Sequence, residues 1–182
     1  MLIHVIVLNG GSSSGKSSIV RALQDSLPQP WLTFGVDDFV DAIPPGMQNS
    51  EDGLVFLPDG RIAVGPGIRR LGAAWEQGIA AIARAGVGVI IDEVFLAGAT
   101  AQERWRAALH GLKVLWVGVR CDPLVASQRE KRRGDRVPGM AAQQADVVHQ
   151  GVTYDLVIDS TNATPSACAQ MIVDRLATMG MT

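Results

Sequence analysis

The chain has 182 residues, of which 47% are apolar, and this is enough for one globular domain with a sizeable hydrophobic core. The formal net charge of −2 argues against a broad basic surface, so neither nucleic acid nor an anionic membrane is an expected partner. Cys121 and Cys168 are too few and too far apart to indicate a disulfide framework. No apolar run approaches the roughly 18 residues that span a bilayer, and the apolar start lacks a basic leader, so we expect a cytoplasmic protein.

The first predicted strand leads into a loop rich in glycine and serine. Residues 3–8 form an apolar run typical of a buried parallel strand, and residues 18–27 carry apolar side chains at helical spacing. The loop between them, residues 10–17, reads GGSSSGKS and fits the pattern G-x-x-x-x-G-K-[ST]. In such a loop the backbone N–H groups surround a polyphosphate, and the following helix N-terminus adds partial positive charge. A structural glycine turn is the alternative, but strand, loop and helix together favour a phosphate site.

The pattern gives separate tasks to the residues of this phosphate loop. Lys16 would reach the β- and γ-phosphates of a nucleoside triphosphate, and Ser17 would bind Mg²⁺ through its hydroxyl oxygen. The nucleotide is expected to contact Gly10, Gly11, Ser12, Ser13, Ser14, Gly15, Lys16, Ser17 and Ser18.

Two carboxylates follow the second predicted strand, residues 31–36. Asp37 and Asp38 come at its carboxyl end, and ligands of open α/β sheets bind at that edge. Asp37 is therefore a candidate base for an acceptor hydroxyl. The alternative for both acids is to cap the short helix predicted over residues 39–43.

A hairpin and a long helix are predicted next. Residues 54–57 and 61–64 flank Pro58-Asp59-Gly60, a favourable turn, and predict a surface hairpin beside the site. The apolar spacing over residues 67–85 indicates one long helix, which Gly86 ends.

A second acidic pair, Asp92 and Glu93, closes the apolar run 87–93, which has the form of a Walker B strand. A charged carboxylate that ends a buried strand carries a large desolvation cost unless it has a partner. We therefore predict that Asp92 binds Mg²⁺ directly or through water. Three roles are open for Glu93: polarising a water molecule, binding the acceptor, or capping a loop.

The rest of the chain continues to alternate helices and strands. Helices are predicted over residues 101–110, 139–150 and 165–179, and strands over residues 114–119 and 156–158. Five strands alternating with helices predict an α/β fold, a three-layer sandwich whose central five-stranded parallel sheet has helices on both faces. No second domain is indicated, so residues 1–182 are expected to form a single domain.

Residues 129–136 are the most charged part of the chain, with four arginines in eight positions. The common interpretation of such a run is a solvated helix face. Phosphoryl transfer also needs positive charge on the transferred group, and Arg133 and Arg136 are candidates to supply it. Triphosphate, metal, base and positive charge thus each have a candidate, and together they indicate a kinase.

The histidines and tryptophans are expected to be structural. His4 lies on a predicted core strand and His110 at the end of a predicted helix, and His149 is likewise expected to be structural. The four tryptophans have the helix or strand spacing of core residues. The sequence has no H-x-E or C-x-x-C spacing, so a zinc site is not expected.

Several segments resemble chloramphenicol phosphotransferase of antibiotic-producing actinomycetes, and the similarity runs along nearly the whole chain. These segments are residues 8–17, 30–37, 102–106, 114–122, 133–137 and 139–141. The resemblance implies a P-loop kinase fold with an arginine-rich lid, placed at about residues 124–150. It also implies ATP and Mg²⁺ as cofactors, and phosphorylation of a primary hydroxyl of the antibiotic as a means of resistance.

The resemblance also implies roles for single residues. Asp37 matches the proposed base of that family, Lys16 the lysine of its nucleotide loop, and Arg133 and Arg136 its lid arginines. The acceptor would meet Ser12, Asp37, Val40, Met47, Asp92 and Phe95. Glu93 departs from the expected second aspartate beside Asp92, and Pro138 after Val137 is another departure.

Two other interpretations stay open. The first is a P-loop kinase for another hydroxylated compound, such as a nucleoside antibiotic or a metabolite like shikimate. The second is a regulatory module that hydrolyses nucleotide slowly and changes shape. A GTPase switch would carry an N-K-x-D motif, and the sequence has none.

Overall fold

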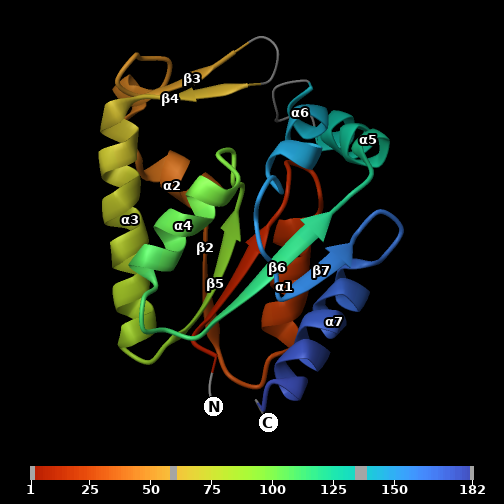
Figure 1. Ribbon diagram of the computed structural model, residues 1–182. Helices are drawn as coiled ribbons and strands as arrows, with labels where there is room; N and C mark the ends of the chain where they lie inside the picture. The colour runs from red at the N-terminus through yellow and green to blue at the C-terminus, as the bar shows by residue number, and fades with distance from the viewer. Residues whose placement is uncertain (1–2, 58–60, 134–138, 181–182) are drawn as a thin grey trace.

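A central parallel sheet organises the molecule (Figure 1). The structure is a computed structural model that describes residues 3–57, 61–133 and 139–180. The sheet has five strands in the order β2-β5-β1-β6-β7. Their bounds are β1 Val5–Asn9, β2 Trp31–Gly35, β5 Gly88–Glu93, β6 Val114–Arg120 and β7 Leu156–Asp159. The predicted five-stranded parallel sheet is therefore confirmed.

The register brings the carboxyl ends of the central strands to one edge. Asn9, the last residue of β1, pairs with Glu93 of β5 and with Gly118 of β6. Gly35 at the end of β2 pairs with Asp92. The phosphate-binding pattern after β1, the acidic pair at the end of β5 and the acidic pair that follows β2 consequently lie along the same edge of the sheet.

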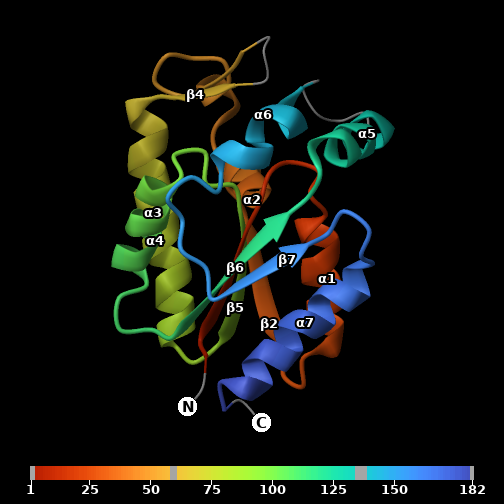
Figure 2. The same ribbon diagram turned by 45° about the vertical axis from the view of Figure 1, so that its right-hand side comes forward.

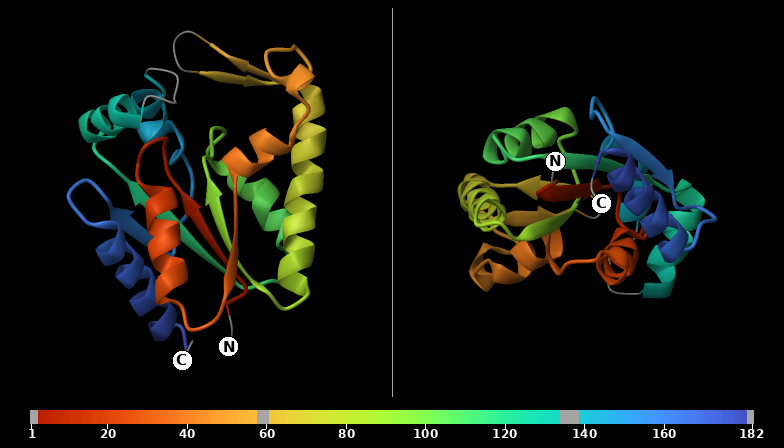
Figure 3. Two further views of the ribbon diagram at one scale, coloured as in Figure 1. Left: turned by 180° about the vertical axis from the view of Figure 1, so that it is seen from behind. Right: turned by 90° about the horizontal axis from the view of Figure 1, so that it is seen from below.

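Helices cover both faces of the sheet (Figure 3). One face packs against α1 (Lys16–Ser26) and α7 (Pro165–Thr178), and the other packs against α3 (Pro66–Arg84) and α4 (Ala99–Ala108). Because side chains alternate along a strand, β1 supplies Ile6 and Leu8 to the first core and Val5 and Val7 to the second. The expected three-layer sandwich follows from this two-sided burial.

Smaller elements stand above the carboxyl edge of the sheet. They are α2 (Val36–Ala42), a 3-10 turn (Pro45–Met47), the strands β3 (Leu54–Phe56) and β4 (Ile62–Val64), and the helices α5 (Pro123–Arg133) and α6 (Met140–Val147). Strands β3 and β4 pair antiparallel as predicted, although their turn at residues 58–60 lies outside the described residues. Figure 2 shows α5 and α6 beyond the carboxyl end of β6.

The helix α2 begins earlier than predicted, directly after β2. Asp37 and Asp38 therefore lie in its first turn and not before it. The Gly35 N–H donates to Asp38 Oδ2 at 2.6 Å, so Asp38 has the capping role that was the alternative for both acids. Negative charge in the first turn of a helix is favourable, which explains why the helix starts there.

The remaining expectations about composition can be compared with the described residues. Cys121 and Cys168 are both free thiols. Among residues 3–57, 61–133 and 139–180, no helix has the length and apolar character to cross a bilayer. His4 has a structural contact as expected, because its Nδ1 accepts from the Lys113 N–H at 3.0 Å.

A buried polar network holds the end of β1 in place. The Asn9 side-chain amide donates to the Val148 carbonyl at 2.7 Å and to the Tyr154 hydroxyl at 2.6 Å, and Asn9 Oδ1 accepts from the Phe95 N–H at 2.9 Å. The Tyr154 hydroxyl lies 2.6 Å from His149 Nδ1. A hydroxyl can both donate and accept, so one proton between the Tyr154 oxygen and Nδ1 completes this contact, and the imidazole needs no positive charge to make it.

His149 gives this network a measurable pH dependence. Burial lowers the pKa of His149 to about 4, with the positive charges of Arg120 and Lys16 contributing in the same direction. In the unfolded chain the imidazole takes up a proton near pH 6.5, whereas in the folded protein it does so only near pH 4. The contribution of neutral His149 to the free energy of unfolding is therefore complete above pH 6.5 and is lost as the pH falls from 6.5 towards 4.

We expect the free energy of unfolding, measured with urea, to fall by about 2–3 kcal/mol more for the wild type than for His149→Gln between pH 7.5 and 4.5. The exposed His110 provides the matched control, and His110→Gln should follow the wild type. Equal losses in the wild type and in His149→Gln would contradict the prediction.

Candidate active site

The phosphate loop runs from the end of β1 into α1, and two of its glycines are required by geometry. Gly15, which precedes the first residue of α1, has φ of 93°, a conformation that other residues adopt only with strain. A Cβ on Gly10 would lie 2.5 Å from the Val119 carbonyl oxygen of β6. Backbone therefore approaches backbone at Gly10, and the pattern needs glycine there for space.

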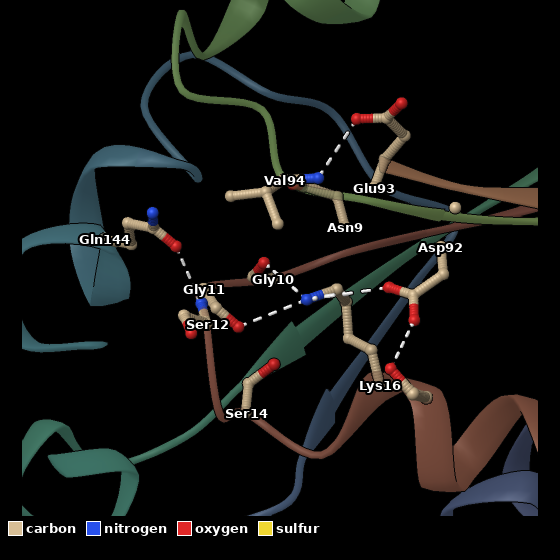
Figure 4. Close-up of polar contacts among 12 residues, drawn as sticks. Asn9, Gly10, Gly11, Ser12, Ser14, Lys16, Asp92, Glu93, Val94 and Gln144 are labelled. Atoms are coloured by element: carbon tan, nitrogen blue, oxygen red, sulfur yellow. Dashed lines mark hydrogen bonds and ion pairs between the residues drawn. The ribbon is translucent and has the colours of Figure 1, made fainter. Parts of the chain in front are cut away.

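Lys16 is buried and lies folded against its own loop (Figure 4). Its Nζ donates to the carbonyl oxygens of Gly10 at 2.8 Å and Gly11 at 3.1 Å, and it lies 3.7 Å from Asp92 Oδ1. The Ser17 hydroxyl donates to Asp92 Oδ2 at 2.8 Å. Three predicted site residues that come from two different elements thus meet at one point.

Several groups at this point are of the kinds that can bind a polyphosphate or Mg²⁺. The Ser13 and Ser14 hydroxyl oxygens are buried and have no hydrogen-bond partner among the described residues. No acidic residue lies in the first turn of α1, so its N-terminus keeps its partial positive charge. The Ser17 hydroxyl and the Asp92 carboxylate could hold Mg²⁺, which commonly binds one or two protein oxygens and takes its other ligands from phosphate and water.

Asp92 and Glu93 are adjacent in sequence but lie on opposite faces of β5. Strand alternation directs Asp92 towards α1, while Glu93 points away from Lys16 (Figure 4). The Glu93 carboxylate accepts a hydrogen bond from the Val94 N–H at 3.1 Å. Of the three roles open for Glu93, this contact corresponds to capping the loop that follows β5. Burial raises the pKa of Glu93 to about 7, and the charges of Glu76 and Asp92 add to the effect.

Glu76 is a buried carboxyl on α3. Its Oε1 lies 3.5 Å from Nε of Arg104 on α4. Burial raises the pKa of Glu76, and the charge of Arg104 partly offsets this rise. No sequence pattern marks Glu76, because its position beside Glu93 depends on how α3 packs against the sheet.

The predicted acceptor residues occupy different environments. Asp37 is exposed on α2, while Val40 and Met47 are half-buried against a small cluster formed by Ile43, Leu54 and Ile68. Phe95 differs from the expectation, because its side chain is only 1% exposed and packs in the main core. It therefore supports the loop after β5 from beneath.

An apolar cleft of about 450 Å³ lies between α2 and α3. It is lined mainly by Phe34, Phe39, Ile43, Trp75, Ile79 and Ile82. None of the predicted acceptor residues lines it. The sequence predicts Trp75 as a core residue, but it is half-buried at this cleft, with Phe39 and Phe34 against its ring.

The arginine-rich segment has two kinds of side chain. Lys131, Arg132 and Arg133 at the end of α5 are exposed, and Arg136 lies outside the described residues. Arg129 precedes these residues on α5 and contacts the phosphate loop, because its guanidinium lies 3.5 Å from the Ser14 carbonyl. The same guanidinium donates to the Ser160 carbonyl at 2.9 Å. The predicted charge cluster thus also contains a residue that binds the loop backbone.

Comparison with known proteins agrees with this architecture. A family model described as chloramphenicol phosphotransferase-like protein matches residues 3–177. Two proteins of Mycobacterium tuberculosis, from strains CDC 1551 / Oshkosh and ATCC 25618 / H37Rv, are both described as "Putative O-phosphotransferase". Each is 31% identical over 176 residues, an alignment that covers 88% of this chain and 76% of the relative.

Solved structures share the fold at low sequence identity. A sugar kinase from Janibacter sp. HTCC2649 aligns with a TM-score of 0.69 and 20% identity, over 100% of this chain and 96% of its own. Shikimate kinase from Acinetobacter baumannii aligns at 0.61 and 14%, over 99% and 96%. The tunicamycin resistance protein of Deinococcus radiodurans aligns at 0.61 and 17%, over 98% and 96%.

At these identities the solved structures establish the fold alone, which is that of small-molecule P-loop kinases. The family is established by the match over residues 3–177 and by the relatives at 31% identity. The chain therefore belongs to the chloramphenicol phosphotransferase-like family and is an O-phosphotransferase of the small-molecule kinase type.

Proposed function

We propose that this protein uses ATP and Mg²⁺ to phosphorylate the primary hydroxyl of chloramphenicol and so inactivates the antibiotic in the cytoplasm. The observation that carries the phosphoryl-transfer chemistry is the meeting of Lys16, Ser17 and Asp92 at the phosphate loop. The choice of chloramphenicol is supported by the family match over residues 3–177.

Each part of the transfer has a residue in this proposal. Lys16 leaves the carbonyls of Gly10 and Gly11 to bind β- and γ-phosphate oxygens. Ser17 and Asp92 would hold Mg²⁺, which would supply neutralising charge to the phosphate oxygens. Loop backbone N–H groups surround the phosphate chain.

Asp37 is the proposed base. It lies in the first turn of α2, and Gly35 at the start of that turn pairs with Asp92 across the sheet. An acceptor bound between α2 and the phosphate loop would have its hydroxyl near both the Asp37 carboxylate and the γ-phosphate. As the acceptor oxygen bonds to the γ-phosphorus, the bond from phosphorus to the β,γ-bridging oxygen breaks, ADP leaves, and Asp37 accepts the hydroxyl proton.

The arginine-rich segment completes the proposal. Arg133 and Arg136 would stabilise the charge that grows on the transferred group, within a lid at about residues 124–150 of one kinase domain. The contact of Arg129 with the Ser14 carbonyl at 3.5 Å supports this proposal, because it joins α5 to the phosphate loop.

The purified protein with MgATP should transfer one phosphoryl group to chloramphenicol, detected by mass spectrometry, and none to an analogue that lacks the primary hydroxyl. A nucleoside antibiotic and shikimate should serve poorly in the same panel. Phosphorylation of the hydroxyl-free analogue would contradict the assigned position. Turnover of another panel member in place of chloramphenicol would move the assignment to that compound.

A second candidate is a kinase for a more polar hydroxylated compound. One observation favours it, because Glu93 and Glu76 place two carboxyl groups near the end of β5, where the family resemblance leads us to expect Asp beside Asp92. A ligand that reaches either carboxyl group could donate a hydrogen bond to it from a hydroxyl or amine. The same substrate panel separates the two candidates.

A further inference from the structure

Gln144 on α6 contacts the phosphate loop directly. Its Oε1 accepts a hydrogen bond from the Ser12 N–H at 2.8 Å, and the residue is only 4% exposed (Figure 4). A backbone N–H can only donate, so the carboxamide oxygen must face Ser12 and the NH2 group must point away from it. The orientation of this side chain is therefore fixed by the loop.

The contact belongs to a close docking of α6 on the loop. A Cβ on Gly11 would lie 3.3 Å from the backbone N of Ala145 and from the C and Cβ of Gln144. The helix thus approaches the loop where the chain has no side chain. Neither Gln144 nor Gly11 can shift far without displacing the other.

The start of helix α6 is also bound to α5. The buried Glu130 carboxylate accepts from the Gly139 N–H at 2.9 Å and from the Ala141 N–H at 2.7 Å. Helix α5 also carries Arg129, which contacts the Ser14 carbonyl at 3.5 Å. The pair α5 and α6 therefore holds the phosphate loop on both sides of Ser13.

We propose that Gln144 is a positioning residue for phosphoryl transfer: its neutral carboxamide sets Ser12 at the point where the phosphate loop meets the acceptor and the terminal phosphate. This inference rests on the proposed kinase function but not on the identity of the acceptor. Two consequences follow from the chemistry of the side chain. Loss of the oxygen frees Ser12, and a carboxylate in its place repels the phosphate chain.

Three variants separate these effects. Gln144→Met keeps the length of the side chain and removes the oxygen that accepts from Ser12. Gln144→Glu keeps that oxygen and adds a negative charge beside the loop. Gln143→Glu adds the same charge to the same helix at an exposed position and is the matched control.

Calorimetry with MgATP alone should give a Kd that rises at least about tenfold for Gln144→Glu and stays within about twofold of wild type for Gln143→Glu. Gln144→Met should keep the MgATP Kd within about threefold while kcat falls about tenfold, with the KM for the acceptor rising and Tm little changed. A purely structural role would instead lower Tm and weaken every step together.

The binding measurement needs no acceptor, so it remains readable even where chloramphenicol is not a substrate. The kcat measurement then uses any acceptor from the panel, or phosphate release to water where none is turned over. The proposal is overturned by wild-type MgATP affinity in Gln144→Glu, by an equal loss in Gln143→Glu, or by wild-type kcat in Gln144→Met.

Discussion

Lys16→Met should lower kcat/KM by at least about 1000-fold while the protein stays folded. The lysine charge acts on the transferred phosphate, where removal of one positive group commonly costs on this order. Folding should survive because methionine fills the same buried space, and Asp92 keeps its hydrogen bond from the Ser17 hydroxyl at 2.8 Å. Turnover, MgATP calorimetry and thermal unfolding together measure the effect.

Lys131 provides the matched control for this change, since it is an exposed lysine on α5. Lys131→Met should leave turnover and MgATP affinity near those of the wild type. A Lys16→Met protein with unchanged ATP affinity and turnover would show that the phosphate loop takes no part in the reaction. Lys16→Ala should behave in the same way as Lys16→Met towards the nucleotide.

Asp37→Asn should reduce kcat by about 100-fold, because asparagine keeps the shape of the side chain but cannot accept the hydroxyl proton. A loose transition state asks little of a base, so weak activity should remain and reflect orientation of the acceptor. Steady-state kinetics with the acceptor that the panel identifies would measure the change. The KM for ATP should be unaffected.

Asp41→Asn is the control for this prediction, because Asp41 is an exposed aspartate on the same helix, α2. Asp41→Asn removes the same charge, but from a position that is not next to the carboxyl end of β2. A loss in Asp41→Asn equal to that in Asp37→Asn would assign the effect to the charge of the helix. An Asp37→Asn enzyme within about twofold of the wild type would remove Asp37 from the mechanism.

The sheet and the phosphate loop could be predicted from the sequence because their signals are local. Each buried parallel strand is a short apolar run, and residues 10–17 contain the whole loop pattern. The meeting of Asp92 with Lys16 could also be expected, since Asp92 lies at the end of β5, Lys16 comes soon after β1, and these parallel strands end at one edge. The start of α2 was predicted less well, because Asp38 caps it through the Gly35 N–H.

By itself, then, the sequence determined the fold class and the chemistry of the phosphate loop, where neighbours in the chain are neighbours in space. Tertiary structure alone decided which side chains reach that loop from a distance. Gln144 contacts Ser12 although they are 132 positions apart in the sequence, and Arg129 contacts Ser14 although they are 115 positions apart. Nothing local distinguishes Gln144 from Gln143; the packing of α6 on Gly11 buries one glutamine and leaves the other in solvent. Likewise Phe95 became a core residue because the Asn9 side chain binds its N–H and the ring fills space over the sheet.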